Sequence, residues 1–211
     1  MTKAVFLSLA LGAGIALPAH AQTLTAVERA LASTIDAHNA DALALLEKIV
    51  NINSGTMNFA GVRQVADVLR PQFDALGFKT RWVDGAAFHR AGHLVAEHPG
   101  PGKKILLVGH LDTVFEPNSP FRKFEKLNDS TARGPGVIDM KGGDVIILYA
   151  LRALKDAGAL DKMNVTVVFD GDEEEAGTPL NLARQTIVDA AKGAEYALGF
   201  EDGSGDPKTA V

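Results

Sequence analysis

The sequence has no cysteine among its 211 residues. This absence excludes disulfide bonds, thiolate metal sites and a cysteine nucleophile. It also lacks a basic cluster, and its formal net charge is −5 at pH 7. We therefore do not expect nucleic acid or an anionic membrane as a partner. A long apolar run occurs only at the N-terminus, so nothing beyond it predicts a segment that spans a membrane.

The N-terminal run is typical of a secretory signal peptide rather than of a membrane anchor. Lys3 supplies a positive start, residues 4–17 are apolar, and Ala19-His20-Ala21 is a small-x-small cleavage site. An anchor needs about 20 apolar residues, which is more than this run provides. We expect residues 1–21 to be a signal peptide that is cleaved near Ala21, with export to the periplasm or secretion. Residues 22–211 would then form one domain.

Hydrophobic periodicity predicts a mixed α/β chain. Residues 24–50 have helical spacing with a break near His38, and a second helix has Asn58 as N-cap, Gly77 after its end, and Pro71 inside, which should kink or split it. Further helices are expected at 142–157 and 179–191, and strands at 79–83, 93–97, 104–109, 164–169 and 196–200. This alternation favours a mostly parallel sheet with helices on both faces.

Candidate functional residues fall at one edge of that predicted sheet. Ligands of open α/β sheets bind beyond the carboxyl ends of the strands. His110 and Asp112 follow the third predicted strand, the acidic run Asp172–Glu175 follows the fourth, and Glu201 follows the last. Asp139 lies in a glycine-rich turn before a helix. Four distant segments therefore bring polar side chains to the same edge.

His110 has a partner at a favourable spacing. A single histidine is more often a surface or core residue than a ligand. In an extended stretch, however, residues i and i+2 share a face, so the Asp112 carboxylate can hold one imidazole nitrogen while the other binds a metal. The histidines at positions 38, 89, 93 and 98 have no such partner, and we expect them to be surface or loop residues.

The acidic residues have structural explanations that account for only part of the pattern. Asp139 could cap a helix, but a cap does not require the glycines around it. Negative side chains at a helix N-terminus contribute about 0.3–1 kcal/mol each, which would explain one or two residues of Asp172–Glu175. Four adjacent carboxylates repel one another unless a cation lies nearby. The glycines match no phosphate-binding pattern. A metal site explains the set better.

These motifs together resemble those of the zinc metallopeptidases and amidohydrolases that include glutamate carboxypeptidase, acetylornithine deacetylase, succinyl-diaminopimelate desuccinylase and aminoacylase. The glutamate carboxypeptidase branch is the most similar. The resemblance covers almost all of the chain after the signal peptide. It rests on three motifs, which are His110-x-Asp112, Asp139-Met140-Lys141-Gly142-Gly143 and Asp172-Glu173-Glu174.

The resemblance implies a role for each motif residue. His110 would bind one zinc and be oriented by Asp112, Asp139 would bridge two zincs, and Glu174 would bind the second zinc. Glu173 would be the general base that takes a proton from a metal-activated water. Manganese or cobalt would also suit such ligands. The family also implies a cis peptide bond after the bridging aspartate.

Two assignments stay open within this resemblance. The glutamate triplet allows Glu174 and Glu175 to be the base and the ligand instead, although the spacing from Asp139 favours the earlier pair. Glu201 matches a further ligand of the first zinc, with Asp202 as the alternative.

The family implies hydrolysis of a peptide or N-acyl amino acid amide bond, but the sequence departs from it in one respect. The family needs a late histidine for the second zinc, and none of the six histidines follows His110. The dimerisation and lid domain of the family and the rest of its catalytic domain are also missing from these residues. We therefore expect an amino-terminal part of the catalytic domain, with little or no turnover and without the family's homodimer. The alternative is a non-catalytic fragment that binds a single metal, or an interaction module.

Overall fold

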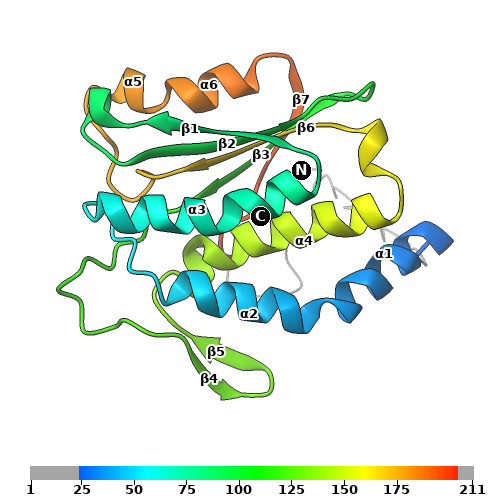
Figure 1. Cartoon of the computed structure of the whole chain (residues 1–211), viewed down its shortest axis with the longest axis horizontal. Helices are drawn as coiled ribbons and strands as arrows, with labels where there is room; N and C mark the ends of the chain where they lie inside the picture. Colours follow the sequence, from blue (N-terminus) through cyan, green and yellow to red (C-terminus); the bar gives the residue numbers. More distant parts are fainter. Residues whose placement is uncertain (1–23, 204–211) are drawn as a thin grey trace, which may run out of the picture.

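The computed structural model describes residues 24–203, so the predicted signal peptide lies outside the described residues. A five-stranded sheet has α5 and α6 on one face and α3 and α4 on the other, and α1 and α2 lie against α4 (Figure 1). No helix within residues 24–203 is long and apolar enough to cross a membrane.

The helices are α1 (Ala26–Ala37), α2 (Asn39–Val50), α3 (Phe59–Ala75), α4 (Gly142–Asp156), α5 (Leu180–Ala183) and α6 (Gln185–Ala191), with short turns η1 (Ala86–Phe88), η2 (Val137–Lys141) and η3 (Leu160–Lys162). The strands are β1 (Lys79–Asp84), β2 (Gly92–His98), β3 (Lys104–His110), β4 (Glu125–Asn128), β5 (Thr131–Arg133), β6 (Asn164–Asp170) and β7 (Ala194–Gly199).

The main sheet has the order β1-β2-β6-β3-β7. Strand β3 pairs in parallel with both β6 and β7, whereas β2 is antiparallel to its neighbours β1 and β6. Four strands therefore run in one direction and β2 runs in the other, because the short connection between β1 and β2 allows only a hairpin. The expected α/β class with a mostly parallel sheet and helices on both faces is confirmed.

Most predicted elements occur within a few residues of their expected bounds, and the exceptions have local causes. The break between α1 and α2 lies at His38, and the Asn58 side chain accepts a hydrogen bond from the amide of Gly61 as an N-cap. Pro71 does not split α3, which continues through it as one helix. The expected helix at 179–191 is divided into α5 and α6 at Arg184. The β4–β5 hairpin was missed, because all four residues of β4 are exposed and carry no apolar pattern.

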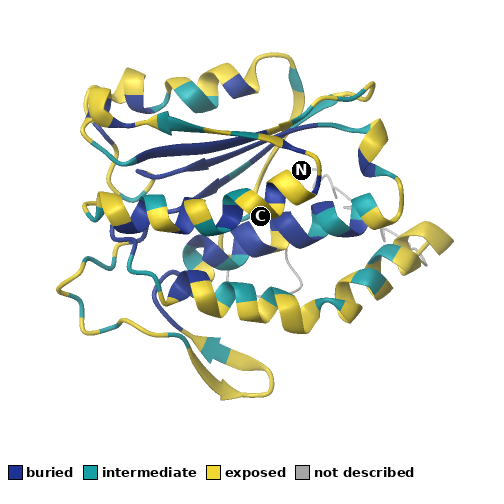
Figure 2. Ribbon diagram, viewed as in Figure 1, coloured by how far each residue is buried: buried dark blue, intermediate teal, exposed yellow. Residues whose placement is uncertain are grey.

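The hydrophobic core lies between the sheet and the layer formed by α3 and α4 (Figure 2). Phe73 of α3 is fully buried, and its ring lies edge-on to Phe78 and to Phe169 of β6, at 5.6 Å between centroids in both pairs. This contact joins α3 to the strand that precedes the acidic run. By contrast, the edge strand β7 leaves Tyr196 and Leu198 about half exposed.

We expect Phe73→Ala to lower the free energy of unfolding by about 3–5 kcal/mol, because it removes a buried ring and leaves a cavity. Urea denaturation of the full chain measures this value. Val188→Ala in α6 is the control, since Val188 is 53% exposed and its truncation should change stability by about 0.5 kcal/mol or less. A loss below about 1 kcal/mol for Phe73→Ala would contradict the packing described here.

Candidate metal centre

The structure brings four of the predicted segments to one edge of the sheet. His110 ends β3, Asp139 lies in η2 before α4, the acidic run follows β6, and Glu201 follows β7. His110 Nε2 is 3.0 Å from Asp139 Oδ1, 3.7 Å from Glu201 Oε2 and 4.0 Å from Glu173 Oε2. The imidazole is buried and the three carboxylates are each about half exposed. The histidine therefore forms the floor of an acidic cluster that opens to solvent.

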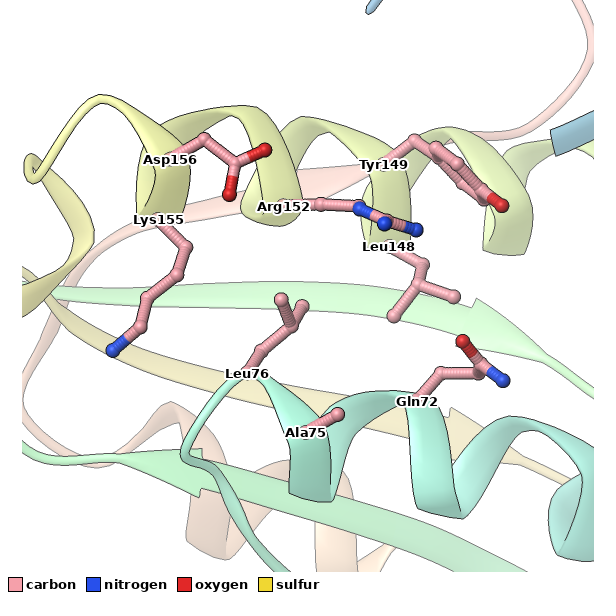
Figure 3. Close-up of a pocket in the computed structure, with 8 residues that line it drawn as sticks. All are labelled: Gln72, Ala75, Leu76, Leu148, Tyr149, Arg152, Lys155 and Asp156. Carbon is pink, nitrogen blue, oxygen red and sulfur yellow. The ribbon is translucent and has the colours of Figure 1, made fainter. Parts of the chain in front are cut away.

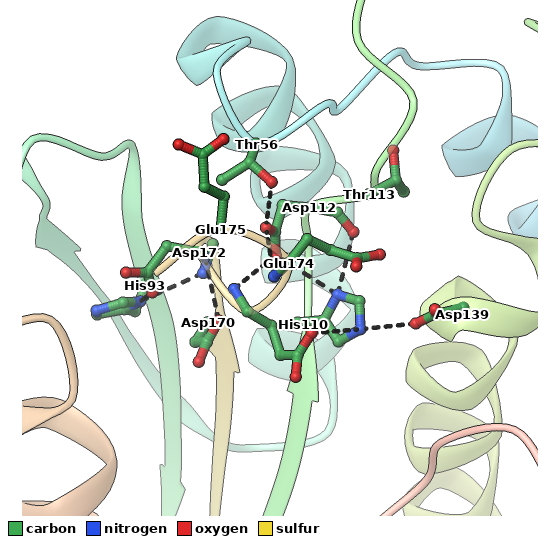
Figure 4. A network of polar contacts seen from close by, with 12 residues as sticks. Thr56, His93, His110, Asp112, Thr113, Asp139, Asp170, Asp172, Glu174 and Glu175 are labelled. Carbon is green, nitrogen blue, oxygen red and sulfur yellow. Dashed lines mark hydrogen bonds and ion pairs between the residues drawn. The ribbon is translucent and has the colours of Figure 1, made fainter. Parts of the chain in front are cut away.

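The orientation of the His110 ring is set by Asp112, as expected, but largely through a different atom. His110 Nδ1 lies 3.0 Å from the main-chain carbonyl oxygen of Asp112 and 3.5 Å from its carboxylate (Figure 4). Donation of the Nδ1 proton to this carbonyl leaves Nε2 directed at Asp139. This is the arrangement in which the outer nitrogen of a histidine can bind a metal.

The electrostatics of His110 favour a cation at this position. Burial alone would lower its pKa, but the Asp112 carboxylate, with Asp144 and Glu201, outweighs burial and raises the pKa to about 10. In the absence of another cation, the imidazole therefore carries a proton at neutral pH. A metal ion that binds Nε2 has to displace that proton.

The Asp112 carboxylate connects the histidine to the acidic run. It is fully buried and accepts hydrogen bonds from the Thr56 hydroxyl at 2.7 Å and from the amides of Glu173 and Glu174 at 3.1 and 3.2 Å. Burial alone would raise the pKa of the Asp112 carboxyl. The contact with His110 and these donors have a larger and opposite effect, so the pKa is lowered and the carboxyl stays ionised. Thr56 was missed by sequence reasoning because it lies in a loop before α3 with no motif around it.

The three glutamates of the run point in different directions. Glu173 lies beside His110, whereas Glu175 turns away and pairs with Arg90 at 3.0 Å. Glu174 Oε1 is buried and has no hydrogen-bond partner among the described residues. Burial, followed by the charge of Asp139, raises the Glu174 pKa. A buried carboxylate oxygen without a partner and beside another carboxylate is the kind of atom that a metal ion would satisfy.

The glycine-rich motif around Asp139 has a steric explanation. A Cβ on Gly143 would collide with the carbonyl oxygen of Phe200, so only glycine lets the chain before Glu201 approach the start of α4. Lys141 is fully buried, and its ammonium donates to the carbonyls of Ile49 and Ile52 at the end of α2, both at 3.0 Å. The expected cis peptide bond between Asp139 and Met140 is present.

The donor set of this cluster fits a zinc ion. Ligand atoms of His110, Asp139 and Glu201 all lie within 4.8 Å of one another. One imidazole nitrogen and several carboxylate oxygens are common zinc ligands, and manganese or cobalt would accept the same set. Glu174 lies next to the group with its buried oxygen unsatisfied. Asp202 makes no contact with His110 comparable to that of Glu201.

A second buried group of acids with a histidine is structural. His93, Asp170 and Asp172 lie together, but both nitrogens of His93 are already bonded, with Nδ1 accepting from the amide of Gly171 and Nε2 donating to the carbonyl of Ala183. Arg184 pairs with Asp172 at 2.7 Å. The expectation that His93 is a surface or loop residue was wrong, because its ring is fully buried and stacked on Phe88.

A cavity of about 310 Å³ lies between the C-terminal halves of α3 and α4 (Figure 3). It is lined by Leu76, Leu148, Tyr149 and Arg152 among others, and includes none of the acidic-cluster residues. The basic residues that line it lie near the C-terminus of α4, where a positive charge interacts favourably with the helix dipole. Lys155 is also paired with Asp161 at 3.1 Å. We assign no part of the metal centre to this cavity.

The chain is similar in sequence to a known family of peptidases. A family model described as peptidase family M20/M25/M40 matches residues 106–209. Carboxypeptidase G2 of Pseudomonas sp. (strain RS-16) is 36% identical over 172 residues, which cover 79% of this chain and 40% of that protein. Acetylornithine deacetylase of Arabidopsis thaliana is 32% identical over 130 residues, which cover 56% of this chain and 28% of that protein.

Solved structures share the fold. Human carnosine dipeptidase 1 superposes with a TM-score of 0.66 at 19% identity, over 82% of this chain and 40% of that one. An M20 family metallo-carboxypeptidase from Sulfolobus solfataricus superposes with a TM-score of 0.61 at 20% identity, over 77% of this chain and 37% of that one. The chain thus spans about 40% or less of the length of these relatives.

We expect His93 to make the fold less stable in mild acid. Burial lowers the pKa of His93 below the value of about 6.5 that it has in an unfolded chain. Below pH 6.5 the unfolded state therefore binds a proton that the folded state does not, and stability is lost as the pH falls. The loss attributable to His93 is at most about 1.4 kcal/mol per pH unit.

Urea denaturation at pH 6.5 and pH 5.0 measures this contribution. His93→Gln should be less stable than the wild type at pH 6.5, because it loses the stack on Phe88. It should nevertheless lose less stability between the two pH values. Equal losses in the two proteins would contradict a buried neutral His93.

Proposed function

We propose that this chain carries the metal-binding part of an exported, zinc-dependent peptidase of the carboxypeptidase type. The match of residues 106–209 to the model of peptidase family M20/M25/M40 supports this class of enzyme. The bond cleaved would be an amide bond of a small peptide or of an N-acyl amino acid. The similarity to carboxypeptidase G2 and acetylornithine deacetylase supports this class of bond.

A single observation carries the proposal. The ligand atoms of His110, Asp139 and Glu201 come within 4.8 Å of one another at the carboxyl edge of the sheet, although they belong to three segments that are distant in sequence. An accidental group of acids would repel and spread apart, whereas these are held by the strand β3, the turn η2 and the end of β7.

The residues around the cluster would divide the reaction between them. Bound zinc would acidify a water molecule and polarise the scissile carbonyl. Glu173 has a half-exposed carboxylate at 4.0 Å from His110 Nε2, so it can take a proton from the attacking water and pass it to the leaving amine. Asp112 would hold Glu173 in place through the main-chain amide.

The family resemblance suggests a second zinc, which Asp139 and Glu174 would hold. The buried, unpartnered Oε1 of Glu174 supports this assignment. A second candidate function is a non-catalytic fragment that binds one metal. It is favoured by the ligand atoms of His110, Asp139 and Glu201, which form one group within 4.8 Å and would hold one ion.

We expect zinc affinity to distinguish a direct metal ligand from the general base. His110→Ala should weaken zinc affinity by more than about 100-fold, because loss of a direct ligand exceeds the 10–100-fold effect of outer partners. Glu173→Gln should bind zinc with nearly wild-type affinity. Competition with a chromogenic zinc chelator measures both affinities for the full chain, and metal analysis gives the number of bound ions.

The wild-type result decides between the two candidate functions. Two bound zinc ions, with hydrolysis of glutamate-terminal dipeptides that Glu173→Gln lowers by about 100-fold or more, support the peptidase. One bound ion without hydrolysis supports the single-metal fragment. Failure of the wild-type chain to bind zinc in the micromolar range would contradict both.

We also expect export with cleavage after Ala21. N-terminal sequencing of the protein recovered from the periplasm of a Gram-negative host should give Gln22 as the first residue. Substitution of Ala19 and Ala21 by leucine should leave the chain uncleaved, because the signal peptidase requires small residues there. A wild-type protein that stays in the cytoplasm with residues 1–21 attached would overturn the export proposal.

A further inference from the structure

The connection between β1 and β2 lies against the end of the acidic run. It contains η1 and then His89, whose φ of 59° is left-handed and turns the chain sharply before Arg90. The carbonyl of Phe88 accepts a hydrogen bond from the amide of Thr178 at 3.0 Å. A side chain on Gly177 would collide with the Phe88 backbone and ring, so the two segments are in close contact.

Arg90 makes most of the polar contacts across this boundary. Its Nε donates to the carbonyl of Glu175 at 2.7 Å, and its Nη2 donates to the carbonyl of Ala176 at 3.2 Å and to the Glu175 carboxylate at 3.0 Å. Its Nη1 donates to the carbonyl of His89 at 2.8 Å. The side chain is only 10% exposed. The planar guanidinium thus holds two consecutive carbonyl groups and the Glu175 carboxylate through a rigid fork of donors, which the single ammonium of a lysine does not provide.

The acidic run is consequently held from two sides. Asp112 accepts hydrogen bonds from the amides of Glu173 and Glu174, and Arg90 donates to the carbonyls of Glu175 and Ala176. The Asp172 carboxylate closes the same turn, because it accepts hydrogen bonds from the Gly177 amide at 2.6 Å and from Arg184 at 2.7 Å. These anchors together define the turn. The position of the turn decides which carboxylates of the glutamate triplet face His110.

We propose that Arg90 is a positioning residue of the metal centre, which draws Glu175 out of the triplet and so presents Glu173 and Glu174 to the metal. The inference rests on the proposed function, since it concerns the same site. Arg90 does not contact the cluster itself. It acts through the backbone at Glu175 and Ala176 and through the charge of the Glu175 side chain.

The charge of Arg90 contributes in a second way. Glu173, Glu174 and Glu175 are consecutive, so each carboxylate raises the energy of the others when all are ionised. The pairing of Glu175 with Arg90 at 3.0 Å neutralises one of them and leaves two for the cation. A triplet without this partner could bind a metal through Glu174 and Glu175 instead, which is the alternative register that the sequence leaves open.

Zinc affinity of the full chain tests the proposal. We expect Arg90→Met, which keeps the aliphatic volume but removes every donor, to weaken zinc binding by about 10–100-fold, as is typical for residues that orient metal ligands. Arg90→Lys should keep the positive charge but lose the planar set of guanidinium donors, and should therefore give an intermediate zinc affinity. Glu175→Gln should weaken binding by less than about threefold, because the bonds to the two carbonyls remain.

Arg63→Met is the matched control for general loss of an arginine. Arg63 pairs with Asp67 at 2.9 Å and lies over the Trp82 ring at 4.7 Å, far along the chain from the acidic run. It should change thermal stability without changing zinc affinity. Hydrogen exchange adds a readout that a purely structural role would not move, because the amides of Glu173 and Glu174 should exchange faster in Arg90→Met than in the control.

The outcomes separate this inference from the proposed function. If the wild type binds zinc and Arg90→Met binds it equally well with unchanged exchange at Glu173 and Glu174, Arg90 is not a positioning residue while the metal centre stands. If Arg90→Met does not fold, Arg90→Lys carries the test, and wild-type affinity in that folded variant overturns the need for the fork. If the wild type itself binds no zinc, the proposed function fails first.

Discussion

The buried carboxylate of Asp112 is the contact on which the rest of the site depends. It accepts three hydrogen bonds, from the Thr56 hydroxyl and from the amides of Glu173 and Glu174, and it lies within 3.5 Å of the His110 ring. Removal of such a group leaves several buried donors unsatisfied, at about 1–3 kcal/mol each. This one side chain therefore links the loop before α3, the end of β3 and the turn after β6 into a single arrangement.

The negative charge near Asp112 explains why this site favours a cation. Asp139, Glu173, Glu174 and Glu201 lie around a single imidazole, and the basic side chains of Lys141 and Arg184 are engaged elsewhere. Lys141 is bound to two carbonyls of the α2 end, and Arg184 is bound to Asp172. Burial and like charges raise the pKa values of Glu174 and Glu201. The site thus stores unfavourable electrostatic energy that a divalent ion would relieve.

The sequence predicted the fold class and the identity of the clustered residues because both depend on local patterns. The apolar strands place His110, the acidic run and Glu201 at one edge whatever the details of packing. The sequence could not predict contacts that join distant segments. Thr56 and Arg90 reach the site from 56 and 85 residues away along the chain, and no motif marks either of them. His93 was misjudged for the same reason, because its partners Gly171 and Ala183 lie far from it in sequence.

Strands β3 and β7 support their ligands in different ways. His110 ends a strand that is paired on both sides, whereas Glu201 follows β7, which within residues 24–203 is paired only with β3. The chain before Glu201 is positioned by the close approach of the Phe200 carbonyl to Gly143 at the start of α4. The geometry of the cluster on the Glu201 side therefore depends on the glycine at position 143, whereas on the His110 side it depends on the pairing of the sheet.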